Sequence, residues 1–122
     1  MEPRRGLVEL KTATVCHDQE RDLYGVAAVF EVVDNYLGGF QDYVYYLQIE
    51  GNSGAPEYGQ VISDQVIAVA SRIDHIDCAM DDQNNVFVAY DRQFEDAQWV
   101  ALVSRSSGTG PFVYWMLLEN DD

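Results

Sequence analysis

Hydrophobic and polar positions alternate with a period of two along most of the chain, which is the pattern of β-strands. In the run from Val86 to Asp91 the even-numbered residues share one face and the odd-numbered residues share the other, and both faces are largely apolar. This predicts a strand that is covered on both sides. The preceding residues, Asp81 to Asn85, favour turn conformations, so we predict a hairpin turn between Met80 and Val86.

The same alternation predicts strands in most of the remaining chain. The predicted strands are rich in β-branched and aromatic residues, and polar or glycine-containing segments separate them. Their connections are short, which favours antiparallel pairing. The predicted strands are Gly6–Cys16, Tyr24–Val33, Gln41–Glu50, a short strand ending near Met80, Val86–Asp91, Gln98–Ser104 and Phe112–Leu118.

One segment, Gln60–Asp74, has a different period. Its apolar residues recur at steps of three and four, which places them on one face of a helix, although many are β-branched and such residues fit helices less well. The sequence therefore predicts an α+β fold. We expect a single domain over residues 1–122, with one helix packed on a largely antiparallel sheet of six to seven strands, and frayed ends at residues 1–5 and 119–122. The apolar residues at helical spacing are Ile62, Val66, Val69, Ala70 and Ile73.

Charge narrows the range of partners. The chain has 21 Asp and Glu residues against 7 Lys and Arg residues, which gives a formal net charge of -14. Binding to nucleic acid or to an anionic membrane depends on basic side chains, so we expect neither as a direct partner. A basic protein surface or cations would be attracted instead. The alternative is that the acidity serves only solubility.

The cellular location and the state of the cysteines can be predicted from the apolar segments and the number of cysteines in the chain. No run approaches the roughly 20 apolar residues of a membrane helix, and the N-terminal residues lack the apolar segment of a secretory signal. We therefore expect a soluble, cytoplasmic protein. Two cysteines do not make a disulfide framework, so Cys16 and Cys78 are expected as buried free thiols.

The cysteines and histidines form two pairs, Cys16 with His17 and His75 with Cys78, that could serve as metal ligands. A zinc site would need all four to converge, yet neighbouring residues of a strand point to opposite sides. Cysteine catalysis is disfavoured because acidic neighbours such as Asp77 would raise the pKa of a thiol. Sequence motifs of nucleotide binding and hydrolysis are absent. We expect no cofactor, no metal and no enzymatic activity.

The candidate partner-binding residues are carboxylates that edge the predicted strands, together with two tyrosines. Carboxylates at turns are exposed and project a common negative field, and tyrosines beside them suit an arginine-rich partner through cation–π contacts. For the tyrosines, simple packing on the sheet is the alternative. The candidates are Asp74, Asp77, Asp81, Asp82, Asp91, Glu95, Asp96, Tyr43 and Tyr45.

These features favour a small acidic binding protein that inhibits or sequesters a basic partner, with nucleases and other nucleic-acid-binding proteins as the expected class. Its carboxylates would occupy the positions at which the partner binds the phosphates of nucleic acid. Anti-CRISPR, anti-restriction and nuclease-immunity proteins share this character of small size and negative charge, and no stretch of this chain resembles a particular family.

One alternative is an assembly subunit of a homo-oligomer, such as a homodimer, or of a phage particle. Strand edges such as Gln41–Glu50 or Phe112–Leu118 would then pair between chains. A third possibility is a small-ligand or metal-binding module built on the two Cys/His pairs.

Overall fold

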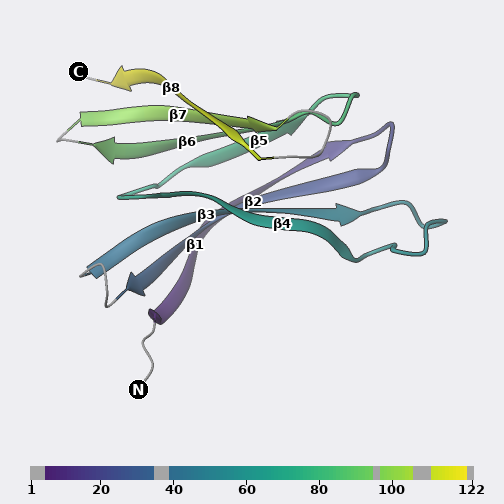
Figure 1. Ribbon diagram of the computed structural model, residues 1–122, viewed down its shortest axis with the longest axis horizontal. Coiled ribbons are helices and arrows are strands. Elements are labelled where there is room, and N and C mark those ends of the chain that lie inside the picture. The colour runs from purple at the N-terminus through teal and green to yellow at the C-terminus, as the bar shows by residue number, and fades with distance from the viewer. Residues whose placement is uncertain (1–4, 35–38, 95–96, 106–110, 121–122) are drawn as a thin grey trace.

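The computed structural model of the protein describes residues 5–34, 39–94, 97–105 and 111–120. These residues form eight β-strands in two antiparallel sheets of four strands, each in sequence order (Figure 1). Sheet A contains β1 (Arg5–Asp18), β2 (Leu23–Asp34), β3 (Gly39–Glu50) and β4 (Val61–Ala70). Sheet B contains β5 (Ile76–Met80), β6 (Val86–Phe94), β7 (Ala97–Arg105) and β8 (Val113–Asn120).

The predicted α+β class is wrong, because the described residues contain no helix and form two sheets rather than one. The segment predicted as a helix contains β4. Strand β4 carries two β-bulges against β3: the pairing passes from Val61 to Ser63 and from Val66 to Ala68 while β3 advances by one residue each time. Ile62 and Ile67 are therefore extra residues in the ladder. The bulge at Ile67 lengthens the spacing between Val66 and Val69 from two residues to three, which resembles a helical step. Ile62 is itself an extra residue, and Ile73 lies in the connection after β4.

The other predicted strands are present with somewhat different ends. The predicted hairpin between Met80 and Val86 is confirmed, because these residues end β5 and begin β6 and pair with each other. Of the residues expected in frayed ends, Arg5 pairs in β1 and β8 continues to Asn120, while residues 1–4 and 121–122 lie outside the described residues. Among the described residues, no helix is long and apolar enough to cross a membrane.

The two predicted pairing edges differ in their outcome. The segment Gln41–Glu50 lies in β3, which is paired with β2 on one side and β4 on the other, so its prediction as a free edge is wrong. The segment Phe112–Leu118 lies largely in β8, the last strand in the order of sheet B.

The sheets form two layers that share one hydrophobic core (Figure 1). Alternate residues of the central strands of each sheet point into the space between the layers, as the period of two requires. Because neither sheet can bury these side chains alone, each layer depends on the other. The core side chains are Ala27, Val29, Val44, Tyr46, Ala70, Ile73, Val86, Val88, Tyr90, Ala101 and Val103.

The chain passes from sheet A to sheet B through residues 71–75, which remain hydrogen-bonded to β6. The amide of Gln93 donates to the carbonyl of Ser71 at 3.1 Å, and the amide of Asp91 donates to the carbonyl of His75 at 3.3 Å. Ile73 is fully buried in the shared core. This connection therefore forms a packed corner between the layers.

Candidate functional site

Two turns from different sheets meet at one end of the molecule. The β1–β2 turn contributes Asp18 and Glu20, and the β5–β6 turn contributes Asp81 and Asp82. We call these four carboxylates the acidic rim. With His17, Gln19 and Met80 they line an open hollow of about 260 Å³.

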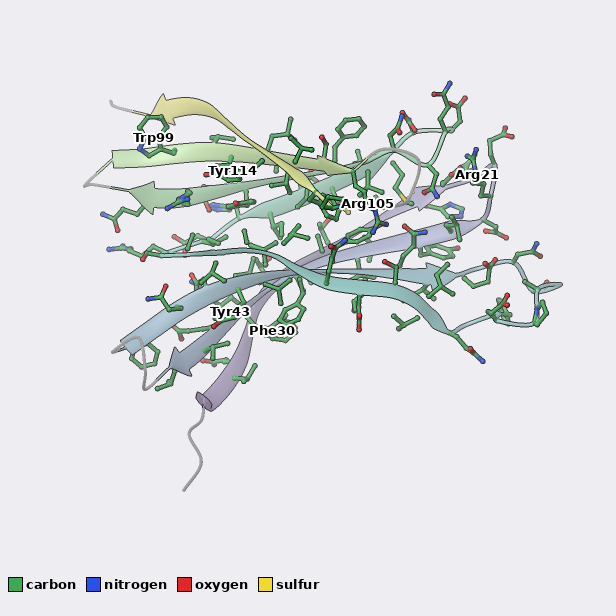
Figure 2. All side chains as sticks on the ribbon, viewed as in Figure 1. Arg21, Phe30, Tyr43, Trp99, Arg105 and Tyr114 are labelled. Atoms are coloured by element: carbon green, nitrogen blue, oxygen red, sulfur yellow. The ribbon has the colours of Figure 1, made fainter. Side chains whose placement is uncertain are left out.

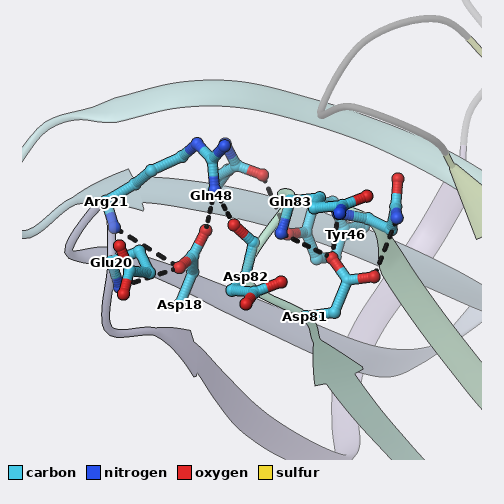
Figure 3. Close-up of polar contacts among 9 residues, drawn as sticks. Asp18, Glu20, Arg21, Tyr46, Gln48, Asp81, Asp82 and Gln83 are labelled. Atoms are coloured by element: carbon cyan, nitrogen blue, oxygen red, sulfur yellow. Dashed lines mark hydrogen bonds and ion pairs between the residues drawn. The ribbon is translucent and has the colours of Figure 1, made fainter.

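Arg21 holds the two turns of the acidic rim together. Its Nη1 atom donates to Oδ2 of Asp18 at 3.1 Å and to the backbone carbonyl of Asp82 at 2.5 Å (Figure 3). The second bond joins residues 61 positions apart in the sequence. Arg21 therefore acts as a crosslink between the turns, and because it binds the backbone carbonyl of Asp82, the side chain of Asp82 remains exposed.

Backbone amides fix two of the four rim carboxylates. The Oδ1 atom of buried Asp18 accepts hydrogen bonds from the amides of Glu20 and Arg21, and that of Asp81 accepts from the amides of Gln83 and Asn85. Short carboxylate side chains commonly stabilise turns in this way. The backbone and side-chain hydrogen bonds from Asn85 also hold the pKa of Asp81 below its usual value, so that it stays ionised.

Asp74 and Asp91 lie away from the rim, at the other end of β5. The carboxylate of Asp91 accepts bonds from the amides of Asp74 and His75 at 2.8 and 3.0 Å, and its Oδ2 lies 2.7 Å from Nδ1 of His75. Burial would raise the pKa of Asp91, but these bonds outweigh it and the pKa is lowered. The hydrogen bond to Asp91 raises the pKa of His75. Asp91 therefore stabilises the corner between the sheets.

The remaining predicted residues lie on further surfaces. Asp77 is exposed on β5, and its Oδ1 accepts a bond from the amide of Cys78 at 2.9 Å. Tyr43 and Tyr45 are half-buried on β3, on the side of sheet A that faces away from sheet B. Glu95 and Asp96 lie outside the described residues. The seven predicted residues that the structure describes therefore lie in different places, and of these Asp81 and Asp82 belong to the acidic rim.

Sequence reasoning missed Asp18, Glu20 and Arg21. The sequence predicts a polar connection between the strands Gly6–Cys16 and Tyr24–Val33, but it does not predict that this connection lies beside the β5–β6 turn. These residues could have been identified only if β1 and β5 were known to be neighbours, because the polar turns after both strands then lie at the same end of the molecule. These strands belong to different sheets, and their contact is not encoded in the local pattern.

A second cluster that the sequence did not reveal surrounds Arg105, which is buried between the layers with 3% of its surface exposed (Figure 2). Its guanidinium donates to Oε1 of Gln48 at 2.9 Å and to Oγ of Ser63 at 3.2 Å. It also lies 5.1 Å and 5.2 Å from the ring centres of Tyr46 and Phe112, within cation–π range. No carboxylate pairs with it among the described residues. Its contacts link both layers, which is a structural role.

The structure brings the two cysteines together and leaves the two histidines apart. Cys78 on β5 donates to Cys16 on β1, with 2.6 Å between the sulfurs. This bond lowers the pKa of Cys16 and raises that of Cys78, which burial raises further. His17 instead lies 3.0 Å from Asp22, and His75 bonds Asp91. In the part of the chain that the structure describes, no three His, Cys, Asp or Glu residues are grouped to hold a metal ion.

Comparison of the chain with models of protein families, with curated proteins and with solved structures finds no match.

Proposed function

We propose that the protein binds a basic partner protein of the nucleic-acid-binding class, such as a nuclease, and inhibits or sequesters it through the acidic rim. The observation that supports this proposal is the junction of two turns from different sheets, fixed by Arg21 and by backbone hydrogen bonds around one open hollow. Because the two turns that carry the carboxylates are held together before the partner arrives, the backbone of the rim loses little conformational freedom on binding.

The chemistry of the rim suits arginine. A guanidinium has donors in a planar fork that match a carboxylate, and the exposed residues Glu20 and Asp82 line the hollow from two different turns. The net charge of -14 would accelerate the encounter with a basic protein. Carboxylates at such a surface would occupy the place of nucleic-acid phosphates. We place this activity in the cytoplasm, where the thiols of Cys16 and Cys78 persist in reduced form.

The test compares two charge-reversed double variants with the native chain as bait in host lysate. The rim variant carries Glu20→Lys and Asp82→Lys. The control carries Glu9→Lys and Glu57→Lys, which change the net charge by the same amount at exposed positions elsewhere. We expect the native chain and the control to capture a basic nucleic-acid-binding protein that a salt gradient releases, and the rim variant to lose it.

Two results would count against this function. Equal loss of capture by both double variants would show that net charge, and not the rim, governs binding. Capture that persists at high salt would show an apolar interface, because screening suppresses exposed charge pairs.

A further inference from the structure

The outer face of sheet A, turned away from sheet B, is an apolar surface that crosses all four strands. Residues paired across an antiparallel ladder share a face, so the register identifies its members. Figure 2 shows two of them, Phe30 and Tyr43, on this side of sheet A. The face consists of four rows: Leu10–Phe30–Tyr43–Val69, Ala13–Ala28–Tyr45–Val66, Val15–Val26–Leu47–Asp64 and His17–Tyr24–Ile49–Val61. We call these four rows the A face.

Much of the A face is open to solvent along the two outer strands of the sheet. On β1, Leu10 and Val15 are 55% and 61% exposed, and on β4, Val66 and Val69 are 43% and 45% exposed. Between them the β3 aromatic side chains are half-buried, and the rings of Phe30 and Tyr45 meet edge to face at 5.4 Å. Contiguous apolar surface of this kind marks an interaction site.

Charge is nearly absent from the A face. Asp64 is its one carboxylate, and His17 is its other readily titrating group. The carboxylates of Glu9, Glu31 and Asp42 alternate to the opposite side of the same strands. In a chain with a net charge of -14, a second acidic molecule can approach this face with Asp64 as the only carboxylate of its four rows.

The A face also has the size that a symmetric pair needs. Four strands about 4.8 Å apart and four rows about 7 Å apart give an area on the order of 500 Å² per molecule. Two such faces together cover about 1,000 Å², which is the size at which specific interfaces begin.

We propose that the A face is the interface of a homodimer, in which the A faces of two copies of this chain stack on each other. The occupant is a second copy because the face has almost no charge: a basic partner gains nothing there from the electrostatic attraction that the acidic rim offers. A face that meets its own copy is self-complementary in a two-fold pair, as symmetric dimers require. The four carboxylates of the acidic rim do not belong to the A face, and the two surfaces share only His17, which lies in the last row of the A face and also lines the hollow. The inference is independent of the proposed function.

The test measures the mass of the purified chain in solution by sedimentation velocity and light scattering. We expect twice the chain mass of 13.8 kDa for the native protein at micromolar concentration. The double variant Leu10→Glu with Val66→Glu should be a monomer, with dimer affinity reduced roughly hundredfold or more, because each substitution occurs twice in a symmetric interface.

A matched control carries the same change of charge outside the A face, at Tyr58→Glu and Val113→Glu, where the native side chains are 57% and 51% exposed. This control should remain a dimer. Val15→Glu is a second interface variant, at the most exposed of the large apolar side chains of the A face, and circular dichroism checks that each variant is folded. If the double variant fails to fold, Val15→Glu tests the interface in its place and should also weaken the dimer.

Salt provides an independent readout. Dimerisation should strengthen as salt rises, because screening reduces the repulsion between two acidic molecules while apolar burial persists. A native protein that stays monomeric up to submillimolar concentration at high salt would overturn the proposal. So would folded interface variants that dimerise as well as the control.

Discussion

The ion pair between His75 and Asp91 secures the corner where the chain leaves sheet A for sheet B. It connects residues 16 positions apart, and Asp91 also accepts two backbone amide bonds there. The pKa of His75 lies above 6.5 because of its hydrogen bond to Asp91, and the pKa of Asp91 lies below 3.8. The charged forms of both side chains are therefore favoured in the folded protein.

This pair predicts a pH dependence of stability. The contribution of His75 is fully present below its unfolded pKa of 6.5 and is lost as the pH rises through its raised folded value. The contribution of Asp91 is present above 3.8 and is lost as the pH falls through its lowered folded value. His75→Gln should therefore flatten the decline in unfolding free energy as the pH rises above 6.5 and through the raised folded pKa of His75. Denaturant unfolding at several pH values measures this, and a variant curve parallel to the native one would contradict it.

Asp18 predicts a larger effect on stability. Its side chain is 1% exposed and serves two turn amides and the guanidinium of Arg21. Asp18→Ala should lower the free energy of unfolding by about 1–3 kcal/mol, because these donors lose their acceptor. Asp82→Ala, in the same rim but exposed, should change it by less than about 0.5 kcal/mol. Equal losses in the two variants, measured by chemical denaturation, would disprove the structural role of Asp18.

For single residues, the sequence predicted where carboxylates lie along the chain better than it predicted what those carboxylates contact. Asp81 and Asp82 were expected at a turn and lie at one. Asp91 was expected to face a partner, but its oxygens accept bonds from Asp74 and His75. Whether a carboxylate faces solvent or a backbone amide depends on the path of a distant segment, which the local pattern does not contain.

At the scale of elements, alternation located the strands wherever the ladder is regular. It failed at β4, where bulges at Ile62 and Ile67 break the period of two. The β-branched side chains of that segment were a physical sign against a helix. Which strands belong to which sheet could not be predicted, because short antiparallel connections are compatible with one sheet or two.

The contact between β1 and β5 predicts a redox response. Cys16 and Cys78 face each other across the two sheets. Oxidised glutathione should accept the two electrons and two protons of these thiols, giving one disulfide in the protein and two reduced glutathione molecules. Closing a loop of 62 residues should stabilise the fold by up to about 4 kcal/mol in the chain-entropy account.

Mass spectrometry should show the loss of two hydrogen atoms, and thermal unfolding should show a higher midpoint. Cys16→Ser is the control and should show neither change. A native protein that forms only mixed disulfides with glutathione would contradict the prediction.

At the scale of the whole molecule, composition gave the sign of the charge and the structure gives its distribution. Carboxylates gather at turns and on the side of sheet A opposite the A face, where Glu9, Glu31 and Asp42 lie. The A face itself is almost free of them. The two proposed interfaces therefore respond to salt in opposite directions. Binding at the acidic rim weakens as salt rises, and stacking of the A faces strengthens.

The sequential order of strands within each sheet also determines the order in which the protein is built during synthesis. Every ladder of sheet A forms within residues 5–70, so this sheet can complete its backbone pairing before sheet B leaves the ribosome. Its inner side chains, such as Val29 and Val44, remain uncovered until β6 and β7 arrive. A nascent chain that has emerged from the ribosome as far as about residue 75 therefore exposes apolar surface on both sides of one finished sheet. That interval is when the protein most needs chaperone protection.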